Sequence, residues 1–460
     1  MFIKSISHFS LVFLSSMIFS KFKKNYLRSK GEALAVILVA GNVGKSSQTL
    51  ILNQIFEHLG YKVWTGTTQN KNRNTLTGLI MTLGELNISL ENANSLQKLG
   101  FLIRAKLIWL FKSWNFGSKP NILIFEVGVD HQNEMEDYIK VFKSADWVVL
   151  SNFGPEHTAG FDTVFNPDKK IISNLADLFS SFPDLDISND ELDNLLKNCY
   201  FEQLKLLNIA QNYILPSSFD LEKSELVISS KAKLHSIRPQ IDRLDNSVLI
   251  VDGIKTPNCF LFPLSFNRQI AMAHKVGERF GLSKSALEEV LANMILPNGR
   301  FGFFEGVNQT KIVDSSYNSD PASLHSFLDL ILEIKSSDKQ YIILGEMREL
   351  GDAAVSVHNE ILERLENISQ TLNVEVILLG ATWLHCRYDR QKFKHFTKVG
   401  DIVRYFKSDL PEVGSWIWIK GSQNTIFLEV LVESLLAKKS DKTKLARQGS
   451  DWDELRQGYL

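Results

Sequence analysis

The sequence contains few cysteines and almost no net charge. Its 460 residues include three cysteines, Cys199, Cys259 and Cys386. No Cys-x-x-Cys pair occurs, which argues against a zinc ribbon or a disulfide scaffold and is typical of a reducing compartment. Lysine plus arginine number 51 and aspartate plus glutamate number 52. This balance excludes a chain that coats nucleic acid through its overall charge, although it permits a local basic patch.

The sequence also lacks an apolar run long enough for a membrane-spanning helix. The longest uncharged run near the start, residues 5–20, is shorter than the roughly 18–20 apolar residues required, and it contains His8 and serines. Most of the basic residues follow this run, whereas a signal peptide carries them before it. Two alternatives stay open for residues 1–30. One is a helix that lies on a membrane with its lysines toward anionic head groups, and the other is a helix packed on the protein's own surface.

A phosphate-binding loop is predicted at the end of the first strand. Residues 33–40 are continuously apolar, as in a strand buried on both faces of a parallel sheet, and a helical pattern begins near Leu50. The loop residues that would contact phosphate are Gly41, Asn42, Gly44, Lys45, Ser46 and Ser47. Lys45 would reach the terminal phosphates and Ser46 would ligate Mg²⁺. Because Gly-x-x-Gly-Lys-Ser is shorter than the general motif, the alternative is a chance turn before a helix.

Two further strands, residues 121–127 and 147–150, end in polar residues. Open parallel sheets bind ligands at these carboxyl ends. Glu126 ends one strand and His157 follows the other, so together they would complete a Mg²⁺ site beside the phosphates. Histidine is an unusual ligand for this hard cation, and the alternative for His157 is a capping or loop histidine.

The C-terminal part predicts a second α/β domain. Its strand candidates are residues 311–314, 341–344, 374–379 and 416–419, with helical patterns between the first three. The predicted fold class is therefore α/β, with a P-loop-type central domain built on a mostly parallel sheet and a C-terminal Rossmann-like domain. Residues 438–460 are charged and lack sustained periodicity, which predicts a mobile terminus or a loose helix.

A series of motifs, taken together, resembles the Mur ligase family, the ATP-dependent amide-forming enzymes of peptidoglycan precursor synthesis. The resemblance is greatest to the branch that adds D-alanyl-D-alanine. Besides the loop at 41–47, the matching segments are residues 74–78, 125–128, 151–157, 297–300, 313–323, 344–351 with His358, and 419–422. They follow the family's order and cover most of residues 33–436.

The resemblance implies that ATP phosphorylates a substrate carboxylate and that an amine, such as that of a dipeptide, attacks the acyl phosphate. Lys45 would hold the β- and γ-phosphates. Ser46 and Glu126 would hold one Mg²⁺, and His157 would hold a second. The family also uses a carboxylated lysine as a metal ligand. Its expected position is Ile171 here, so Lys170, or its neighbour Lys169, is assigned this role, against the alternative of a surface lysine pair.

The resemblance places other nucleotide contacts elsewhere in the chain. Arg300 would contact the phosphates when the domains close, and Asp314 would meet the ribose. The alternative is that these two residues pair with each other. Asn267 and Gln269 stand in place of the family's amides near the adenine.

Substrate contacts are implied at Asn74, Thr75, Tyr317, Asn318 and Glu349. The alternative for Tyr317 and Asn318 is a turn, and the alternative for Glu349, and likewise for Glu346, is a solvated carboxylate at a strand end.

Two departures from the family bear on the substrate. About thirty residues precede the first strand, too few for an independent core, where the family has a domain that binds the uridine nucleotide. Residues 175–245 are polar, helical-looking and poorly matched. The expected organisation is an N-terminal helix at 1–30, a central ATP-binding domain at 31–298, a C-terminal domain at 299–437 and the tail.

Two functions follow as alternatives. The first is an active amide ligase of the D-Ala-D-Ala-adding type that uses ATP and Mg²⁺ on small carboxylate and amine substrates, a cytoplasmic monomer with no nucleic-acid partner. The second is a nucleotide-binding, catalytically weakened homologue with a regulatory or interaction role. If the N-terminal helix faces a membrane, it would place the protein at the inner face of the cell membrane under either of these two functions.

Overall fold

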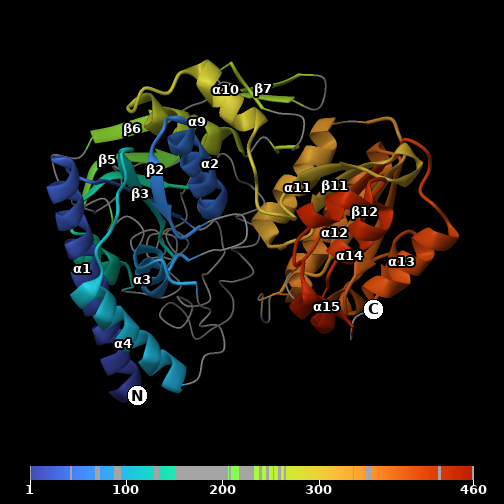
Figure 1. Cartoon of the computed structure of the whole chain (residues 1–460). Helices are drawn as coiled ribbons and strands as arrows, with labels where there is room; N and C mark the ends of the chain where they lie inside the picture. Colours follow the sequence, from blue (N-terminus) through green and yellow to red (C-terminus); the bar gives the residue numbers. More distant parts are fainter. Residues whose placement is uncertain are drawn as a thin grey trace, which may run out of the picture. The chain divides into compact units, whose positions relative to one another are not determined.

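The computed structural model describes most of the chain in two compact units (Figure 1). The described residues are 2–41, 44–67, 73–87, 95–128, 134–151, 206, 209–216, 233–237, 241–244, 248–251, 253–256, 261–263, 266–334, 336–348, 350, 354–422 and 426–457. The first unit holds the described residues up to 151, strands β5 and β6, and residues 268–290. The second holds strands β7 to β9 and residues 291–457.

The first unit is built on a six-stranded parallel sheet. Its strands are β1 (Ala35–Ala40), β2 (Lys62–Thr65), β3 (Asn121–Glu126), β4 (Ala145–Leu150), β5 (Ala210–Pro216) and β6 (Lys233–Ile237). They lie in the order β2-β3-β1-β4-β5-β6, and every neighbouring pair is parallel. The apolar run of β1 is buried because helices cover both faces of a parallel sheet. The predicted strands at 33–40, 121–127 and 147–150 are confirmed.

Strands occupy part of the segment that looked helical in the sequence. Besides β5 and β6, the described residues of 175–245 include β7 (Ile241–Leu244), which forms an antiparallel sheet with β8 (Val248–Val251) and β9 (Ile254–Lys255). The expectation of helix is therefore wrong for these residues. Pairing with neighbouring strands supplies their backbone hydrogen bonds, and such tertiary context overrides local pattern.

The helices of the first unit include a long N-terminal one, α1 (Phe2–Lys30). The other described helices are α2 (Lys45–His58), α3 (Leu76–Gly84), α4 (Ser95–Phe111) and α5 (Glu134–Phe142), together with α9 (Asn267–Glu278) and α10 (Lys284–Ala292), most of whose residues belong to this unit. Ile18, Phe19, Phe22 and Tyr26 of α1 are fully buried, and the Phe22 ring meets the Trp64 ring edge-on at 5.0 Å. The C-terminal half of α1 is thus packed on the protein's own surface. No described helix is both long and apolar enough to cross a membrane.

The second unit contains a mixed sheet with the predicted doubly wound pattern. Its strands are β10 (Gly302–Glu305), β11 (Lys311–Ser315), β12 (Gln340–Gly345), β13 (Val374–Leu379), β14 (Lys394–Phe396) and β15 (Trp416–Lys420). The order is β10-β11-β15-β12-β13-β14, and only the β10–β11 pair is antiparallel. The α/β fold class predicted for both domains is confirmed.

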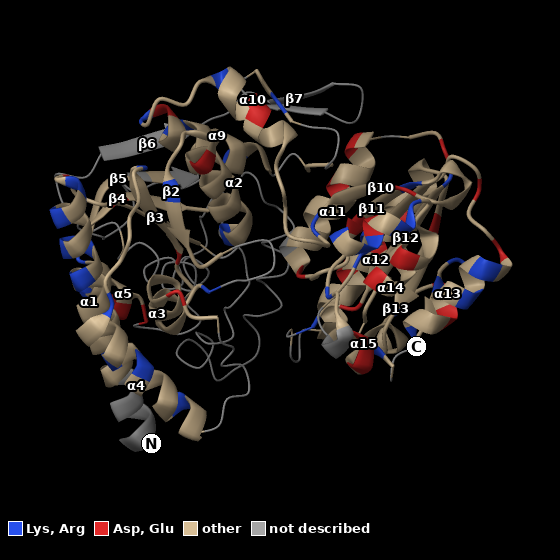
Figure 2. Ribbon diagram, viewed as in Figure 1, with Lys and Arg blue, Asp and Glu red and all other residues tan. Residues whose placement is uncertain are grey.

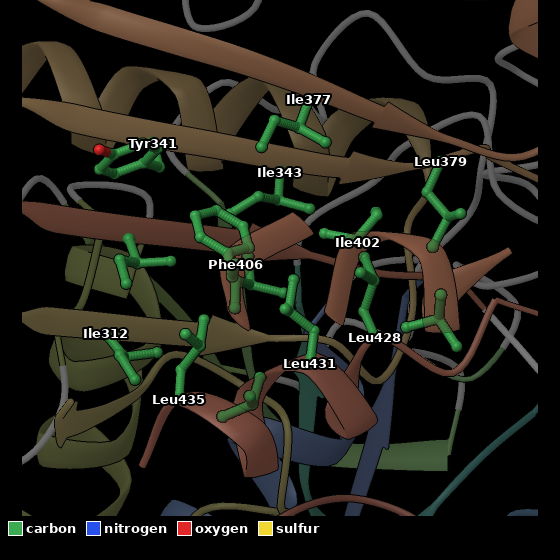
Figure 3. Close-up of a cluster of buried hydrophobic side chains, with 14 of the residues drawn as sticks. Ile312, Tyr341, Ile343, Ile377, Leu379, Ile402, Phe406, Leu428, Leu431 and Leu435 are labelled. Atoms are coloured by element: carbon green, nitrogen blue, oxygen red, sulfur yellow. The ribbon is translucent and has the colours of Figure 1, made fainter. Parts of the chain in front are cut away.

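The core of the second unit lies between this sheet and two helices. Alternate residues of the strands, such as Ile343 and Ile417, pack against α13 (Val399–Ser408) and α14 (Glu429–Leu435) (Figure 3). Trp418 of β15 points to the other face of the sheet. There its ring centroid lies 6.0 Å from that of Phe327 in α11 (Pro321–Ile334). One of the helical patterns predicted between the strands of this part of the chain is α12 (Ala354–Thr371), which lies between β12 and β13 in the sequence.

The C-terminal tail is part of this core, which corrects the prediction of a mobile terminus. It forms a short 3-10 turn (Lys439–Lys444) and helix α15 (Ser450–Arg456). Leu445, Arg447 and Arg456 are buried. Arg447 forms an ion pair of 3.1 Å with the fully buried Glu429. Two charged side chains of the tail, Arg447 and Arg456, are therefore internal contacts.

Candidate nucleotide and metal site

The carboxyl end of β1 is the natural ligand position of the first sheet. β1 lies between β3 and β4, so the chain crosses over in opposite directions on its two sides, and such a switch point is where open α/β sheets bind ligands. Gly41 and Gly44 have φ angles of 116° and 83°, which favour glycine. Lys45 is buried at the first turn of α2. The free amides of a helix N-terminus attract anions, as the phosphate-loop prediction requires.

A carboxylate stands beside this loop with two hydroxyl groups. Ser46 Oγ donates to Glu126 Oε1 at 3.1 Å, and Thr67 Oγ1 donates to Glu126 Oε2 at 2.9 Å. Glu126 is buried at the end of β3, opposite Val39 of β1 in the parallel register. The structure therefore brings Ser46 and Glu126 together as predicted. Three oxygen-bearing side chains in one place suit a hard divalent cation.

Thr67 is a site residue that the sequence analysis missed. It follows β2, and only the strand order brings β2 next to β3 and so brings Thr67 to Glu126. The available signal was a hydroxyl residue just after the short strand β2, which ends at Thr65 and was not among the predicted strands. This signal is weak, because threonine is common at strand ends.

An amide from α9 lies against the phosphate loop. A Cβ atom built on Gly44 would be 2.2 Å from Gln269 Nε2, so the Gln269 side chain touches the loop backbone. Gln269 Oε1 and Asn267 Oδ1 are buried and accept no hydrogen bond from any described residue. Buried polar atoms normally have partners. The open acceptor of Gln269 beside the loop therefore suits a bound ligand that donates a hydrogen bond.

Ser151 closes the other side of the loop. Its Oγ donates to the carbonyl of Ala40 at 3.0 Å, and a Cβ atom on Gly41 would be 2.4 Å from that Oγ. Glycine at position 41 is therefore required by space as well as by φ.

The segment implied to bind substrate is attached to the same sheet edge. The carbonyl of Asn74 accepts from Gly128 N and from Tyr138 Oη, each at 2.9 Å. Thr75 Oγ1 accepts from Gly78 N at 3.2 Å and so caps α3. These contacts give Asn74 and Thr75 structural roles, and their contact with substrate stays a prediction.

Arg300 and Asp314 belong to the second unit and do not form an ion pair with each other there. The Arg300 guanidinium lies 5.1 Å from the centroid of the Tyr317 ring, and Arg447 lies 5.2 Å from the same ring. Asp314 is fully buried, accepts from Ser316 N at 2.9 Å, and has its pKa raised by burial. The alternative, in which Arg300 pairs with Asp314, is therefore wrong, whereas their contacts with phosphate and ribose stay predictions.

We compared the chain with known proteins, and no family model matches it. The UDP-N-acetylmuramoyl-tripeptide--D-alanyl-D-alanine ligase of Rickettsia prowazekii is 24% identical over 304 residues, 65% of this chain and 63% of the relative. The ligase of the same name from Borreliella burgdorferi is 23% identical over 317 residues, 65% and 60% of the two chains. The chain thus spans less than two thirds of the length of these relatives.

Solved structures show the same likeness in three dimensions. A crystal structure of MurF from Acinetobacter baumannii gives a TM-score of 0.61 at 17% identity, covering 93% of this chain and 80% of that one. The MurF ligase from Thermotoga maritima, in complex with ADP, gives a TM-score of 0.57 at 15% identity. The match covers 92% of this chain and 83% of that one. The chain has the fold of a Mur ligase. The resemblance read from the motifs is confirmed.

The Mur-like motifs of the second unit hold neighbouring loops in place. Glu346 accepts from Thr382 N at 2.6 Å, so it is not a solvated carboxylate. His358 Nε2 accepts from Met347 N at 2.9 Å, and its Nδ1 lies 2.6 Å from the carbonyl of Ala354. Because Nε2 accepts, Nδ1 carries the proton. Burial lowers the pKa of His358, which favours this neutral form.

The Tyr317–Asn318 segment is held through its backbone. The Tyr317 carbonyl accepts from Arg447, and the Asn318 carbonyl accepts from Lys420 Nζ at the end of β15. These contacts support the turn-forming interpretation, while contact with substrate stays a prediction.

Four of the predicted site residues, Asn42, His157, Lys170 and Glu349, lie outside the described residues, as does Lys169. Their assigned roles stay predictions. Ser47 is described and buried in the first turn of α2.

Proposed function

We propose that this chain is an ATP-dependent amide ligase that acts through an acyl phosphate, in peptidoglycan precursor synthesis, with a D-Ala-D-Ala-type amine acceptor. The observation that carries the proposal is the meeting of the 41–47 loop with Glu126, Thr67 and Gln269 at one switch point. Its chemistry is that of a bound nucleotide with a divalent cation. The names of the similar proteins, and the ADP in one of their structures, support the reaction type.

The residues of the site fit Mg²⁺. Ser46 Oγ and the Glu126 carboxylate would hold the ion, and Thr67 would orient the carboxylate from its other oxygen. When bound, Mg²⁺ supplies positive charge that offsets the phosphate charge. His157 and Lys170 are proposed for a second ion.

The proposed reaction uses few protein groups. A carboxylate oxygen of the donor attacks the γ-phosphorus of ATP, and ADP leaves. The amine nitrogen then attacks the acyl carbon, phosphate leaves, and the nitrogen loses a proton. Lys45 and the loop amides hold the phosphates in line and stabilise the charge that develops. Gln269 orients the nucleotide, and Arg300 adds a cation to the phosphates.

The proposal is tested by phosphate release from ATP in the presence of muramoyl-peptide carboxylates and D-Ala-D-Ala. Release should require both substrates and Mg²⁺, and Lys45→Ala should reduce it at least about 100-fold. The matched control is Lys140→Ala, an exposed lysine of the same unit. Release that is unchanged in Lys45→Ala would refute the assignment. Nucleotide binding without release for any substrate pair would favour the catalytically weakened homologue.

We further propose that the enzyme is cytoplasmic, because it consumes ATP. It has few cysteines, as expected in a reducing compartment.

A further inference from the structure

An exposed apolar stripe runs along α4. Its side chains recur every three or four residues and are between 45% and 79% exposed: Leu96, Leu99, Ile103, Leu107, Leu110 and the adjoining Phe111. At 3.6 residues per turn this spacing places them on one face of the helix. The buried residues of α4, Phe101, Ala105 and Ile108, lie on the opposite face. α4 therefore packs on the protein through one apolar face and exposes a second, which is unusual in a soluble protein.

The N-terminal half of α1 adds further exposed aromatic side chains. α1 and α4 contact each other and lie side by side (Figure 1). Phe9 is 74% and Phe13 is 54% exposed. Lys21 of α1 fixes the pair, because its Nζ donates to the carbonyls of Trp109 and Leu110 at 2.8 and 3.2 Å, at the C-terminal end of α4. We call the stripe of α4 with Phe9 and Phe13 the α1–α4 face.

The charge of these two helices is of one sign. α1 and α4 contain nine basic and no acidic residues, so the remainder of the chain has a formal net charge of −10. Figure 2 shows this segregation as blue segments without red ones along both helices. Arg104 and Lys106 are exposed and, by helical spacing, flank the apolar stripe on either side. Among the described residues neither forms an ion pair.

We propose that the α1–α4 face docks on the surface of an anionic phospholipid bilayer. Apolar side chains would enter the boundary between head groups and acyl chains, while Arg104 and Lys106 reach outward to the phosphates. A second copy of the chain would bring the basic residues that flank the stripe, Arg104 and Lys106, close to those of the first copy, which disfavours self-association through this face. A nucleic acid would use the basic residues but would leave the leucine stripe in water.

Docking would position the nucleotide site near the bilayer. α1 packs on α3, and Ser15 Oγ lies 3.5 Å from the carbonyl of Leu76 at the start of α3. Thr75 and Asn74 precede that residue and connect to the end of β3, where Glu126 lies. The docking proposal does not depend on the proposed ligase reaction, since binding to lipid requires neither substrate nor turnover.

The experiment measures co-sedimentation of the full chain with vesicles, either of phosphatidylcholine alone or mixed with phosphatidylglycerol. We expect binding to the anionic vesicles, at least about tenfold weaker binding to phosphatidylcholine, and weakening with salt. Ile103→Glu with Leu107→Glu should reduce anionic-vesicle binding at least about tenfold, because the charge opposes insertion. Arg104→Glu with Lys106→Glu should remove most of the salt-dependent part of the binding to anionic vesicles.

The matched control is Leu410→Glu with Val413→Glu, two exposed apolar residues of the second unit at 53% and 72%. This control should bind vesicles as the unsubstituted chain does. Circular dichroism and thermal unfolding should be alike for all variants, because every substituted side chain is exposed. Failure to bind anionic vesicles, or equal binding by the stripe variant, would overturn the proposal. A dimer that forms without vesicle binding and is lost in the stripe variant would assign the face to a second copy instead.

Discussion

The carboxyl edges of the two six-stranded sheets carry motifs of the same family but use their polar side chains differently. At the first edge, Ser46 and Thr67 donate to the Glu126 carboxylate, and Gln269, beside a glycine loop, has an acceptor oxygen that no described residue fills. At the second edge, His358 and Arg447 bond to backbone groups of neighbouring loops. A motif residue can therefore serve the ligand directly or serve the loop that meets it. The predictions below separate these two roles.

The largest expected effect is on the second edge. Arg447→Ala would leave Glu429 buried without its cation, and breaking such a pair costs about 3–5 kcal/mol of folding free energy. Burial already raises the pKa of Glu429, despite the opposing effect of Arg447. Urea unfolding measures the loss. Arg404→Ala, which breaks an exposed pair with Asp401, should cost less than about 1 kcal/mol. Equal losses would show that the buried pair has no special role.

The next effect is on the first edge. Glu126→Gln keeps the size of the side chain but removes the charge that would hold Mg²⁺. We expect phosphate release to fall at least about 100-fold, with the Mg²⁺ requirement shifted to higher concentration. Thermal unfolding should change little, since the amide oxygen still accepts from Ser46 or Thr67. Glu136→Gln, on the exposed surface of α5, is the control. Full activity in Glu126→Gln would exclude it as a metal ligand.

Alanine substitutions at two glycines can distinguish the effect of backbone strain from the loss of the nucleotide site. Gly44 and Gly60 have φ angles of 83° and 85°, so an alanine costs roughly 1–2 kcal/mol at either position. Only at Gly44 does the new Cβ meet a neighbour, the Gln269 amide, because nothing lies within 4 Å at Gly60. We expect both variants to lose similar stability and only Gly44→Ala to lose nucleotide affinity, about tenfold. Nucleotide titration by calorimetry measures the affinities, and equal values would contradict the assignment of Gln269.

The smallest effect is a pH dependence at the second edge. Burial lowers the pKa of His358, so the unfolded chain takes up a proton near pH 6.5 that the folded chain does not. Stability from this group is complete above that pH and is lost as the pH falls toward the folded pKa, by at most about 1.4 kcal/mol per pH unit. His358→Gln should flatten the curve of unfolding free energy against pH. His385→Gln, at an exposed histidine, should leave the curve unchanged.

Much of the fold could be predicted because its central strands are mostly buried. β1 is a continuous apolar run, β3 and β13 are mostly apolar, and β13 falls at the predicted residues 374–379. β5 and β6 could not be predicted in this way. They form strands because β4 offers β5 a parallel partner and β5 in turn offers one to β6.

The site could be predicted in part for a related reason. The residues of the 41–47 loop follow one another along the chain, so their spacing alone indicates phosphate binding. Glu126 could be included because it ends a recognisable strand.

The sequence by itself determined the α/β class, the phosphate loop and the likeness to the Mur ligases, since each depends on residues that are close along the chain or on ordered motifs. Only the tertiary structure decided that Thr67 joins the site, that Gln269 touches the loop backbone at Gly44, that Arg447 is an internal contact, and that α4 exposes a second apolar face. These depend on which elements pack together. A pattern along one helix or strand indicates that a face is apolar, but burial by a neighbouring element decides whether that face is core or surface.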